Sequence, residues 1–390
     1  MTGELPADAY PHAGETIGTA RQVYDGALTP DLAVSTFRNI DRLFPSRVIA
    51  HGRDVLPLPP AARPLGQVEF SSNGRRWDLY DFLAVNRIAG LLVLKGGRTA
   101  LELYQYGNTE RTRWMSMSVA KSLTSTLIGA ALAQGRIGSL DDCVTKYVVA
   151  LAGSAYEAVS VRQILTMTSG VKWNETYTDP DSDRRRLLEA QISQRPGAAL
   201  ELMSSLPRIA PPGTVNNYST GETQVAGEIL RGATAKPLAH YLSERIWRRA
   251  GMEADATWWL ASPGGIEIAG SGIAATLRDY GRFGLFFLGG GVAGGERILP
   301  AGWTAQAGSS KTLAGGKRLA YGWFWWPAVA TAATPDAQDA FAAIGICGQR
   351  LYLNPRERVV IVCWGAWSKP QGMDVVDYTD FCAAVAAALR

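Results

Sequence analysis

Residues 115–132 read MSMSVAKSLTSTLIGAAL, and their pattern predicts a buried helix. Apolar side chains recur every four residues from Val119 to Ala131, and neighbouring apolar residues widen that face. The segment carries one charge, on Lys121, which follows Ser118 by three residues. This spacing places the two side chains one helical turn apart, near the helix start. A lone lysine in a buried helix needs a physical reason, because an unpaired ammonium is costly to bury.

Two interpretations of the Ser118–Lys121 pair are open. Apolar surroundings and a helix N-terminus both disfavour the ammonium form. A neutral amine one turn from a hydroxyl can then act as its base. Alternatively, the lysine extends its charge to solvent beside a serine that only caps the helix. Ser-x-x-Lys is short enough to occur by chance, so the pair alone does not decide.

The bulk composition predicts a globular protein. The chain has 390 residues, 47% hydrophobic and 19% charged, which suffices for a large core and two domains. A net charge of +4 gives no case for nucleic acid, and the short basic run at 184–186 is expected on a solvated face. We find neither a signal-peptide pattern nor a membrane-spanning segment, and we expect a cytoplasmic protein.

Cysteine and histidine usage excludes several kinds of site. The four cysteines lack Cys-x-x-Cys spacing, which disfavours a metal knuckle or a disulfide-stapled fold. Only three histidines exist, His12 and His51 in a Pro/Gly-rich leader and His240 in a helix-like stretch. The sequence therefore offers few histidines for a Ser-His-Asp triad or for a zinc site built from histidines. We expect no metal and no cofactor.

The order of patterns predicts an α/β (α+β) protein with an inserted helical domain. Two strands near 89–94 and 98–104 form a hairpin, and strand-rich runs return near the C-terminus before a last helix. The predicted boundaries are an irregular N-terminal arm at 1–75, an α/β domain at 76–140 and 265–390, and a helical domain at 141–264.

Three further segments carry local expectations. Residues 271–291, SGIAATLRDYGRFGLFFLGGG, predict a helix that ends in glycines. Residues 318–326, RLAYGWFWW, predict a strand, and the low-complexity stretch 328–340 predicts an exposed loop.

A second candidate group lies in PPGTVNNYSTGETQVAGEIL, residues 211–230. Ser219 and Glu222 have the spacing of a capping box that opens a helix. Tyr218 comes just before this helix, where a positive dipole would lower the phenol pKa and let it shuttle protons.

A third candidate group lies in IGICGQRLYLNP, residues 344–355. Its glycines let the backbone approach a ligand closely, and its amides could donate to an oxyanion. The alternative is a core strand whose glycines serve packing.

These segments, in this order from about residue 85 onward, resemble the serine β-lactamase-like hydrolases. That family includes class C β-lactamases, family VIII carboxylesterases, DD-peptidases and 6-aminohexanoate-dimer hydrolases, and the likeness is greatest to the last. SMSVAKS matches its Ser-x-x-Lys segment, and the runs at 135–148, 159–171, 211–230, 271–291 and 348–362 resemble its successive landmarks. The resemblance implies a β-lactamase/transpeptidase-like fold, an antiparallel sheet flanked by helices with an inserted, mostly helical domain.

The resemblance also implies residue roles. Ser118 would be the nucleophile, and Lys121 with Tyr218 would take its proton. The backbone N–H groups of Ser118 and Ile346 would hold the oxyanion. Tyr177, in WNETYTDPD, falls at a substrate-contacting tyrosine. The further expected substrate contacts are Trp173, with one of Trp323 or Trp325 in the same cleft, and Thr220, Cys347 and Gly348.

The chain departs from the family at two motifs. Residues 218–220 read Tyr-Ser-Thr in place of Tyr-x-Asn or Tyr-x-Ser. Residues 347–349 read Cys-Gly-Gln in place of Lys-Thr-Gly or His-x-Gly, so the strand cation that helps hold a substrate carboxylate is missing. Lys317, Arg318 or Arg350 could substitute. Cys347 is expected to pack as a small strand residue rather than to act as a second nucleophile.

The leading hypothesis is a serine hydrolase that cleaves a small-molecule ester or linear amide through an acyl-enzyme. No nucleic acid, membrane or cofactor partner is expected, and a homodimer is left open. The alternatives are a weak β-lactamase or D-amino-acid peptidase, and a non-catalytic acyl-binding protein on the same fold.

Overall fold

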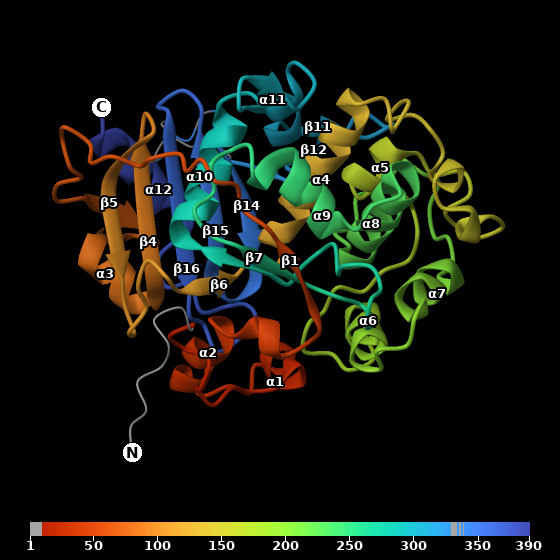
Figure 1. Ribbon diagram of the computed structural model, residues 1–390, viewed down its shortest axis with the longest axis horizontal. Coiled ribbons are helices and arrows are strands. Elements are labelled where there is room, and N and C mark those ends of the chain that lie inside the picture. Colours follow the sequence, from red (N-terminus) through yellow and green to blue (C-terminus); the bar gives the residue numbers. More distant parts are fainter. Residues whose placement is uncertain (1–9, 329–333, 335–336, 338) are drawn as a thin grey trace.

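A computed structural model describes residues 10–328, 334, 337 and 339–390 of the chain. Figure 1 shows a large sheet on one side of the molecule and a mostly helical part on the other. All neighbours in the large sheet are antiparallel. Its strands, in spatial order, are β13 (Trp326–Pro327), β14 (Phe341–Gly345), β15 (Gln349–Asn354), β16 (Val359–Gly365), β4 (Ile88–Lys95) and β5 (Arg98–Tyr104).

The predicted hairpin is confirmed as β4 and β5. Helices cover both faces of the sheet, so β16 carries no charged residue and β4 carries one only at its last position, Lys95. Alternate residues of β15 show the two faces: Leu353 meets Gly284 of α10 (Leu277–Leu288), while Arg350 lies over Tyr378 of α12 (Tyr378–Ala388). Phe381 of α12 stacks on Phe82 of α3 (Leu79–Val85), with ring centroids 3.7 Å apart.

A second antiparallel sheet leads into the Ser118 segment. Its order is β1 (Ser46–Ile49), β7 (Ala256–Trp259), β8 (Ile273–Thr276) and β6 (Arg113–Met115). The predicted buried helix is confirmed as α4 (Val119–Ala133), which follows β6 directly. Gly135, just beyond the C-cap, has φ 68°, the left-handed conformation that glycine adopts at a helix end.

Helix α8 (Thr220–Thr234) is the centre of the helical part. It packs on α4 and on the shorter helices around it. These are α5 (Val161–Leu165), α6 (Asp183–Ile192), α7 (Ala198–Ser205) and α9 (Leu238–Leu242). The helical pattern expected up to residue 264 ends earlier, because β7 belongs to the second sheet.

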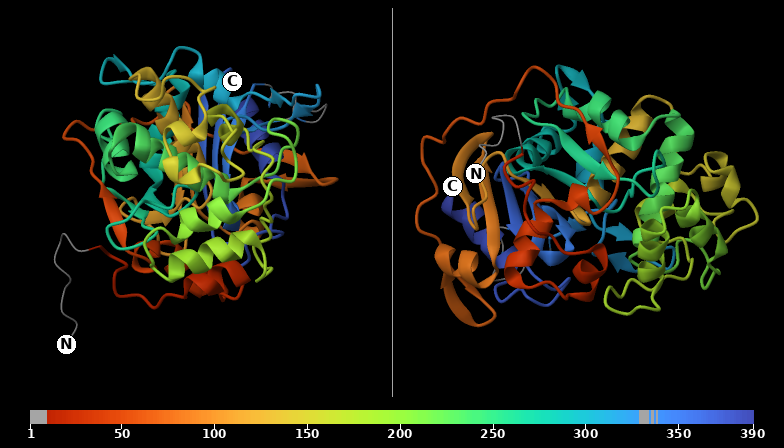
Figure 2. Two further views of the ribbon diagram at one scale, coloured as in Figure 1. Left: turned by 90° about the vertical axis from the view of Figure 1, so that its right-hand side faces the viewer. Right: turned by 60° about the horizontal axis from the view of Figure 1, so that its bottom comes forward.

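The described part of the expected N-terminal arm, residues 10–75, is not irregular throughout. These residues form α1 (Ala20–Asp25) and α2 (Pro30–Phe37), then β1 and β2 (Glu69–Ser72), the last paired with β3 (Arg75–Asp78). Threonine side chains cap both helices, and these Thr-x-x-Gln and Thr-Pro signals were available in the sequence. Figures 1 and 2 place α1 and α2 under the sheet and the helical part.

Other local expectations are corrected in the same way. Residues 273–276 are strand β8, so the helix predicted for 271–291 begins only at Leu277. Between 318 and 326 only β12 (Arg318–Leu319) and the first residue of β13 are strand, because the chain turns at Phe324, where φ is 58°. The loop predicted for 328–340 lies mostly outside the described residues.

Short elements complete the chain. They are β9 (Val292–Ala293), β10 (Glu296–Arg297), α11 (Trp303–Gly308) and β11 (Lys311–Thr312), with single helical turns at Ile40–Arg42, Val144–Lys146, Val149–Leu151, Ser243–Trp247 and Ile346–Gly348. Within the described ranges, no helix is both long enough and apolar enough to cross a bilayer.

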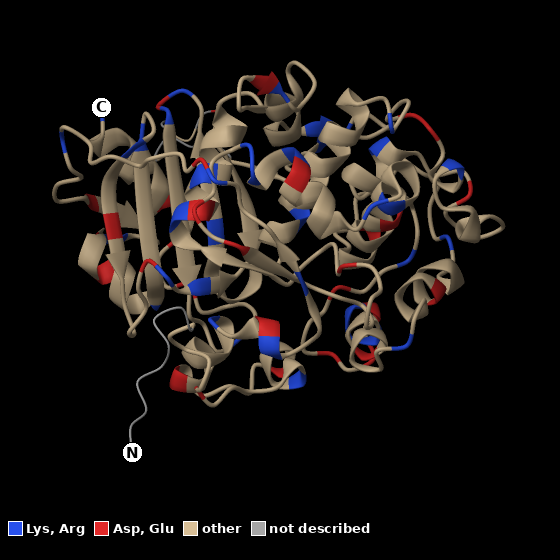
Figure 3. Ribbon diagram, viewed as in Figure 1, with Lys and Arg blue, Asp and Glu red and all other residues tan. Residues whose placement is uncertain are grey.

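Charged residues of both signs are interspersed along the ribbon in Figure 3. The solvated-face interpretation of the 184–186 run is wrong for two of its members. Arg184 and Arg185 are buried, the first against the ring of Tyr24 and the second paired with Asp25 at 2.6 Å.

Candidate active site

Ser118 lies at the junction of β6 and α4 with its hydroxyl unused by the helix. It is the N-cap residue of α4, yet its side chain makes no capping hydrogen bond. The residue before it, Met117, has φ 40°, a strained conformation for a side chain of that size. Ser118 Oγ instead lies 2.8 Å from Lys121 Nζ. The helix-capping interpretation of this serine is therefore wrong.

Lys121 is 1% exposed, so its amine does not extend to solvent. Its Nζ donates to Thr220 Oγ1 at 2.9 Å and to the Gly270 carbonyl at 3.2 Å, besides its contact with Ser118. Burial lowers the pKa of Lys121 to about 7, and the Glu175 carboxylate opposes that shift. A large neutral fraction thus exists near pH 7, and a neutral amine has a lone pair for the Ser118 proton.

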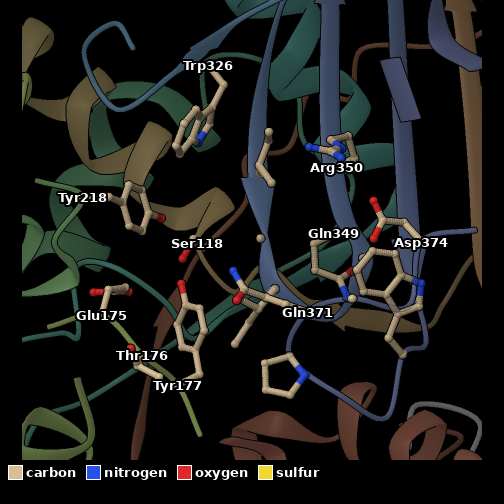
Figure 4. Close-up of a pocket in the computed structure, with 17 residues that line it drawn as sticks. Ser118, Glu175, Thr176, Tyr177, Tyr218, Trp326, Gln349, Arg350, Gln371 and Asp374 are labelled. Atoms are coloured by element: carbon tan, nitrogen blue, oxygen red, sulfur yellow. The ribbon is translucent and has the colours of Figure 1, made fainter. Parts of the chain in front are cut away.

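Tyr218 lies just before α8, with Lys121 Nζ 5.2 Å from its ring centroid. Burial and the nearby Glu175 charge raise the pKa of this phenol, while a hydrogen bond with Ser118 opposes them. The predicted lowering of its pKa is wrong, because desolvation outweighs the helix dipole here. Tyr218 is a neutral proton donor at ordinary pH. Figure 4 shows the hydroxyls of Tyr218 and Tyr177 both pointing toward Ser118.

Ser219 caps α8 by accepting from the Glu222 N–H at 3.0 Å. The capping box is only half formed, since the Glu222 carboxylate turns to the Ser169 hydroxyl.

The end of β14 comes against the Ser118 backbone. A Cβ atom on Gly345 would lie 3.1 Å from Ser118 N and 2.6 Å from the Ser116 carbonyl oxygen, so the close approach requires glycine. The next residue, Ile346, lines the same cavity as Ser118. Neither the Ser118 nor the Ile346 N–H donates to a protein acceptor among the described residues. Two backbone donors are thus free for a ligand at the place where the sequence predicted an oxyanion hole.

The cavity at Ser118 has a volume of about 600 Å³. Of the predicted substrate contacts, Tyr177 and Gly348 line it. Trp173, Thr220 and Cys347 do not. Its other walls include Glu175, Trp326, Gln349, Arg350, Gln371 and Asp374, as Figure 4 shows.

Of the three predicted contacts that do not line the cavity, Trp173 and Thr220 contact Glu175 instead. Trp173 Nε1 donates to Glu175 Oε2 at 2.5 Å. Thr220 donates its hydroxyl to Glu175 Oε1 at 2.5 Å and its N–H to Oε2 at 2.9 Å. Cys347 is fully buried in a left-handed conformation, φ 61°, with its N–H on the Pro370 carbonyl. Burial raises the pKa of the Cys347 thiol, which fits a packed residue and not a nucleophile.

Glu175 is the functional residue that the sequence interpretation missed. It connects Thr220, and through it Lys121, to the cavity wall. A signal was present, because an acid stood two residues before the predicted substrate tyrosine, Tyr177. Trp326 was missed by a single position, since the cleft tryptophan was expected at 323 or 325.

The histidines play no part in this cavity. His12 bonds Thr112, His51 pairs with Asp255, and His240 is exposed. No group of three or more His, Cys, Asp or Glu side chains within the described part of the chain is arranged to hold a metal ion.

Comparison with known proteins identifies the family. Residues 83–382 match the Beta-lactamase family. The chain belongs to the β-lactamase family. This β-lactamase-family protein is 31% identical over 353 residues to the 6-aminohexanoate-dimer hydrolase of Paenarthrobacter ureafaciens, covering 86% of this chain and 85% of the other.

Solved structures agree on the fold. A Bacillus anthracis protein assigned provisionally as a 6-aminohexanoate-dimer hydrolase superposes with a TM-score of 0.77 at 24% identity, covering 88% of this chain and 90% of that one. A family VIII carboxylesterase superposes with a TM-score of 0.58 at 17% identity, covering 77% and 91%. The predicted family, the β-lactamase/transpeptidase-like fold and the serine hydrolase class are confirmed.

The burial of the thiols predicts their reactivity. Cys143 is exposed, and Cys347, Cys363 and Cys382 are buried. We expect Ellman's reagent to modify one thiol per native chain and four in denaturant. Replacing Cys143 with Ser should abolish the native reaction and leave three on unfolding. Rapid native modification of Cys347 would contradict its packed environment.

Proposed function

We propose that this β-lactamase-family hydrolase cleaves an ester or linear amide through an acyl-enzyme formed on Ser118. The observation that carries the proposal is the 2.8 Å contact between the Ser118 hydroxyl and a buried Lys121 whose pKa is about 7. A base that is neutral near the operating pH, in contact with a hydroxyl, is what activation of a serine requires.

The first half of the reaction uses groups on three elements. Neutral Lys121 takes the proton of Ser118 Oγ as that oxygen attacks the substrate carbonyl. The N–H groups of Ser118 and Ile346 donate to the developing oxyanion, a contribution of about 3–4 kcal/mol per donor in acyl-transfer enzymes. Tyr218 then donates its proton to the leaving oxygen or nitrogen and regains one from the lysine ammonium. The second half repeats these steps with water as the nucleophile.

Glu175 and Thr220 set the state of the base. Thr220 passes a hydrogen bond from Lys121 to Glu175, which fixes the amine beside Ser118. Without the carboxylate, burial would lower the lysine pKa further, because Glu175 is the charge that raises it. The threonine at the third position of the second motif thus keeps a role, although a buried one with no place on the cavity wall.

The substrate class follows from the cavity and the relatives. Residue 347 lies in the turn between β14 and β15 and not on a strand as expected, and a cysteine there supplies no cation, which disfavours β-lactams held by their carboxylate. The Paenarthrobacter relative, named for a linear amide dimer, supports an ester or linear amide, with the 6-aminohexanoate dimer as a specific candidate. The non-catalytic alternative is opposed by the intact contact of Ser118 with Lys121.

A cytoplasmic location is also proposed, in keeping with four free cysteines and no spanning helix among the described residues. The homodimer stays a prediction.

The nucleophile is tested by replacing Ser118 with Ala. The wild type should form one covalent adduct with a fluorophosphonate probe, seen by intact-protein mass spectrometry, and should hydrolyse p-nitrophenyl butyrate. Both should be lost in the variant, with turnover falling at least 10³-fold, roughly the loss seen when a catalytic nucleophile is removed. A wild type that neither reacts nor turns over would favour the acyl-binding alternative. Detectable nitrocefin turnover that S118A abolishes would favour the β-lactamase alternative.

The pH dependence tests the base. Since the active form of Lys121 is neutral, kcat/KM should rise with pH through a pKa of about 7. Glu175→Gln removes the charge that raises this pKa, so the rise should move to lower pH by roughly one unit. The exposed Glu201→Gln is the matched control and should leave the profile in place. A shift to higher pH in E175Q would contradict the assignment.

Tyr177 tests the linear-amide substrate. Its neutral phenol lines the cavity, and burial raises its pKa well above the ordinary value. An amide nitrogen must be oriented to receive the proton that Tyr218 donates, and a hydrogen bond from the Tyr177 hydroxyl would hold it, whereas nitrophenolate leaves as an anion and needs no such contact. Tyr177→Phe should therefore lower kcat/KM for the 6-aminohexanoate dimer about tenfold more than for p-nitrophenyl butyrate. Exposed Tyr80→Phe is the control. Equal losses on both substrates would remove the main support for the amide assignment.

A further inference from the structure

Arg350 is a partly buried cation with no acidic partner among the residues that the structure describes. It lies on β15 between Ile344 of β14 and Cys363 of β16, and its guanidinium carbon lies 4.5 Å from the ring centroid of Tyr378. Across the described residues, no carboxylate lies within 4.0 Å of it, and it makes no hydrogen bond. A guanidinium stays charged and offers a fork of donors that matches a carboxylate.

Arg350 stands where two cavities meet. The cavity at Ser118 and a second one of about 470 Å³ share three lining residues, Trp326, Ile344 and Arg350. Figure 4 shows the guanidinium directed across β14 toward the side where Trp326 lies. The cavity at Ser118 and the second cavity therefore border each other at Arg350.

The proposed chemistry decides which half of a substrate reaches Arg350. Tyr218 donates to the leaving atom, so that atom must lie beside the Tyr218 hydroxyl. The ring of Tyr218 packs against Trp326, with centroids 5.5 Å apart, and Trp326 lines both cavities. A leaving group that starts at Tyr218 therefore runs along Trp326 and Ile344, an apolar path suited to methylene groups, and ends at Arg350.

We propose that Arg350 binds a carboxylate at the far end of the leaving group, so that the enzyme prefers substrates whose leaving alcohol or amine carries a terminal acid. This inference rests on the proposed function, because it uses Tyr218 to place the leaving atom. Arg350 supplies, from β15, the cation that is absent at residue 347. Lys317 and Arg318, the other candidates, are exposed and line neither cavity.

The acids nearby do not fill this role for Arg350. Asp374 lines the first cavity, and Asp377 and Asp380 line the second. Asp377 is engaged as the N-cap of α12, where it accepts from the Thr379 and Asp380 N–H groups. All three carboxylates lie beyond salt-bridge distance of Arg350. Because like charges repel, we expect an anionic ligand to lie on the guanidinium side of the space.

The test compares two esters that differ only at the end of the leaving group, 6-(butyryloxy)hexanoate and 6-(butyryloxy)hexanamide. Their common acyl group makes the ratio of kcat/KM values a measure of leaving-group recognition. The wild type should prefer the acid about tenfold, as a charge-assisted bidentate contact predicts. Arg350→Gln should bring the ratio to about one, and Arg350→Lys, which keeps the charge without the fork, should lie between. The exposed Arg318→Gln should keep the wild-type ratio.

A wild-type ratio near one, or an unchanged ratio in R350Q, would overturn the proposal. Binding of hexanoate and hexanamide to the Ser118→Ala variant, measured by calorimetry, gives a readout that needs no turnover. There we expect hexanoate to bind more tightly than hexanamide, to lose that advantage when R350Q is added and to keep part of it with R350K. If the fluorophosphonate adduct fails to form while the hexanoate preference persists, the proposed function fails and the anion site stands. Equal binding of both ligands overturns the anion site alone.

Discussion

An amine held out of water is the constraint on which this cleft depends. Lys121 is buried where α4, α8 and the 270 loop meet, and each of the three supplies one acceptor for its nitrogen. An ammonium in that place loses its hydration, which is why its pKa falls. The surrounding elements must keep their positions to within hydrogen-bond tolerance, because a displaced acceptor would leave a buried donor unsatisfied. The same packing that seats the lysine also presents the Ser118 hydroxyl.

Much of the fold and the centre of the site could be predicted because strong local patterns carry them. The period of α4 placed Ser118 and Lys121 on one face, and the β4–β5 hairpin followed from two apolar runs around a glycine turn. The roles of Tyr218 and Ile346 could be predicted only from the order of several segments along the chain, because that order resembles a known family. Helices α1 and α2 were missed although Thr19 and Thr29 marked their starts, because Pro and Gly nearby suggested irregular chain.

Other features could not be predicted, because they depend on contacts between residues that are far apart in the sequence and on which of several opposing contributions to a pKa is larger. A helix N-terminus predicts a lowered phenol pKa for Tyr218, but desolvation and the Glu175 charge act on the same group and outweigh it. Trp173 and Thr220 lie close to the cleft, as expected, yet a carboxylate stands between them and the cavity and takes up their donors. Arg184 and Arg185 looked like a solvated run, although Tyr24 and Asp25, about 160 residues earlier, bury them.

The N-terminal helix α1 supports the active site although it lies outside the cavity. Asp25 of α1 fixes Arg185, and Arg185 in turn donates to the backbone carbonyl of Tyr177 at 3.3 Å. The rings of Tyr24 and Tyr177 lie 6.4 Å apart. Helix α1 therefore holds the loop that carries Tyr177 in place, although no residue of α1 lines the cavity. Mutations at Tyr24 or Asp25 can therefore change substrate preference by moving Tyr177, while Ser118 and Lys121 keep their positions.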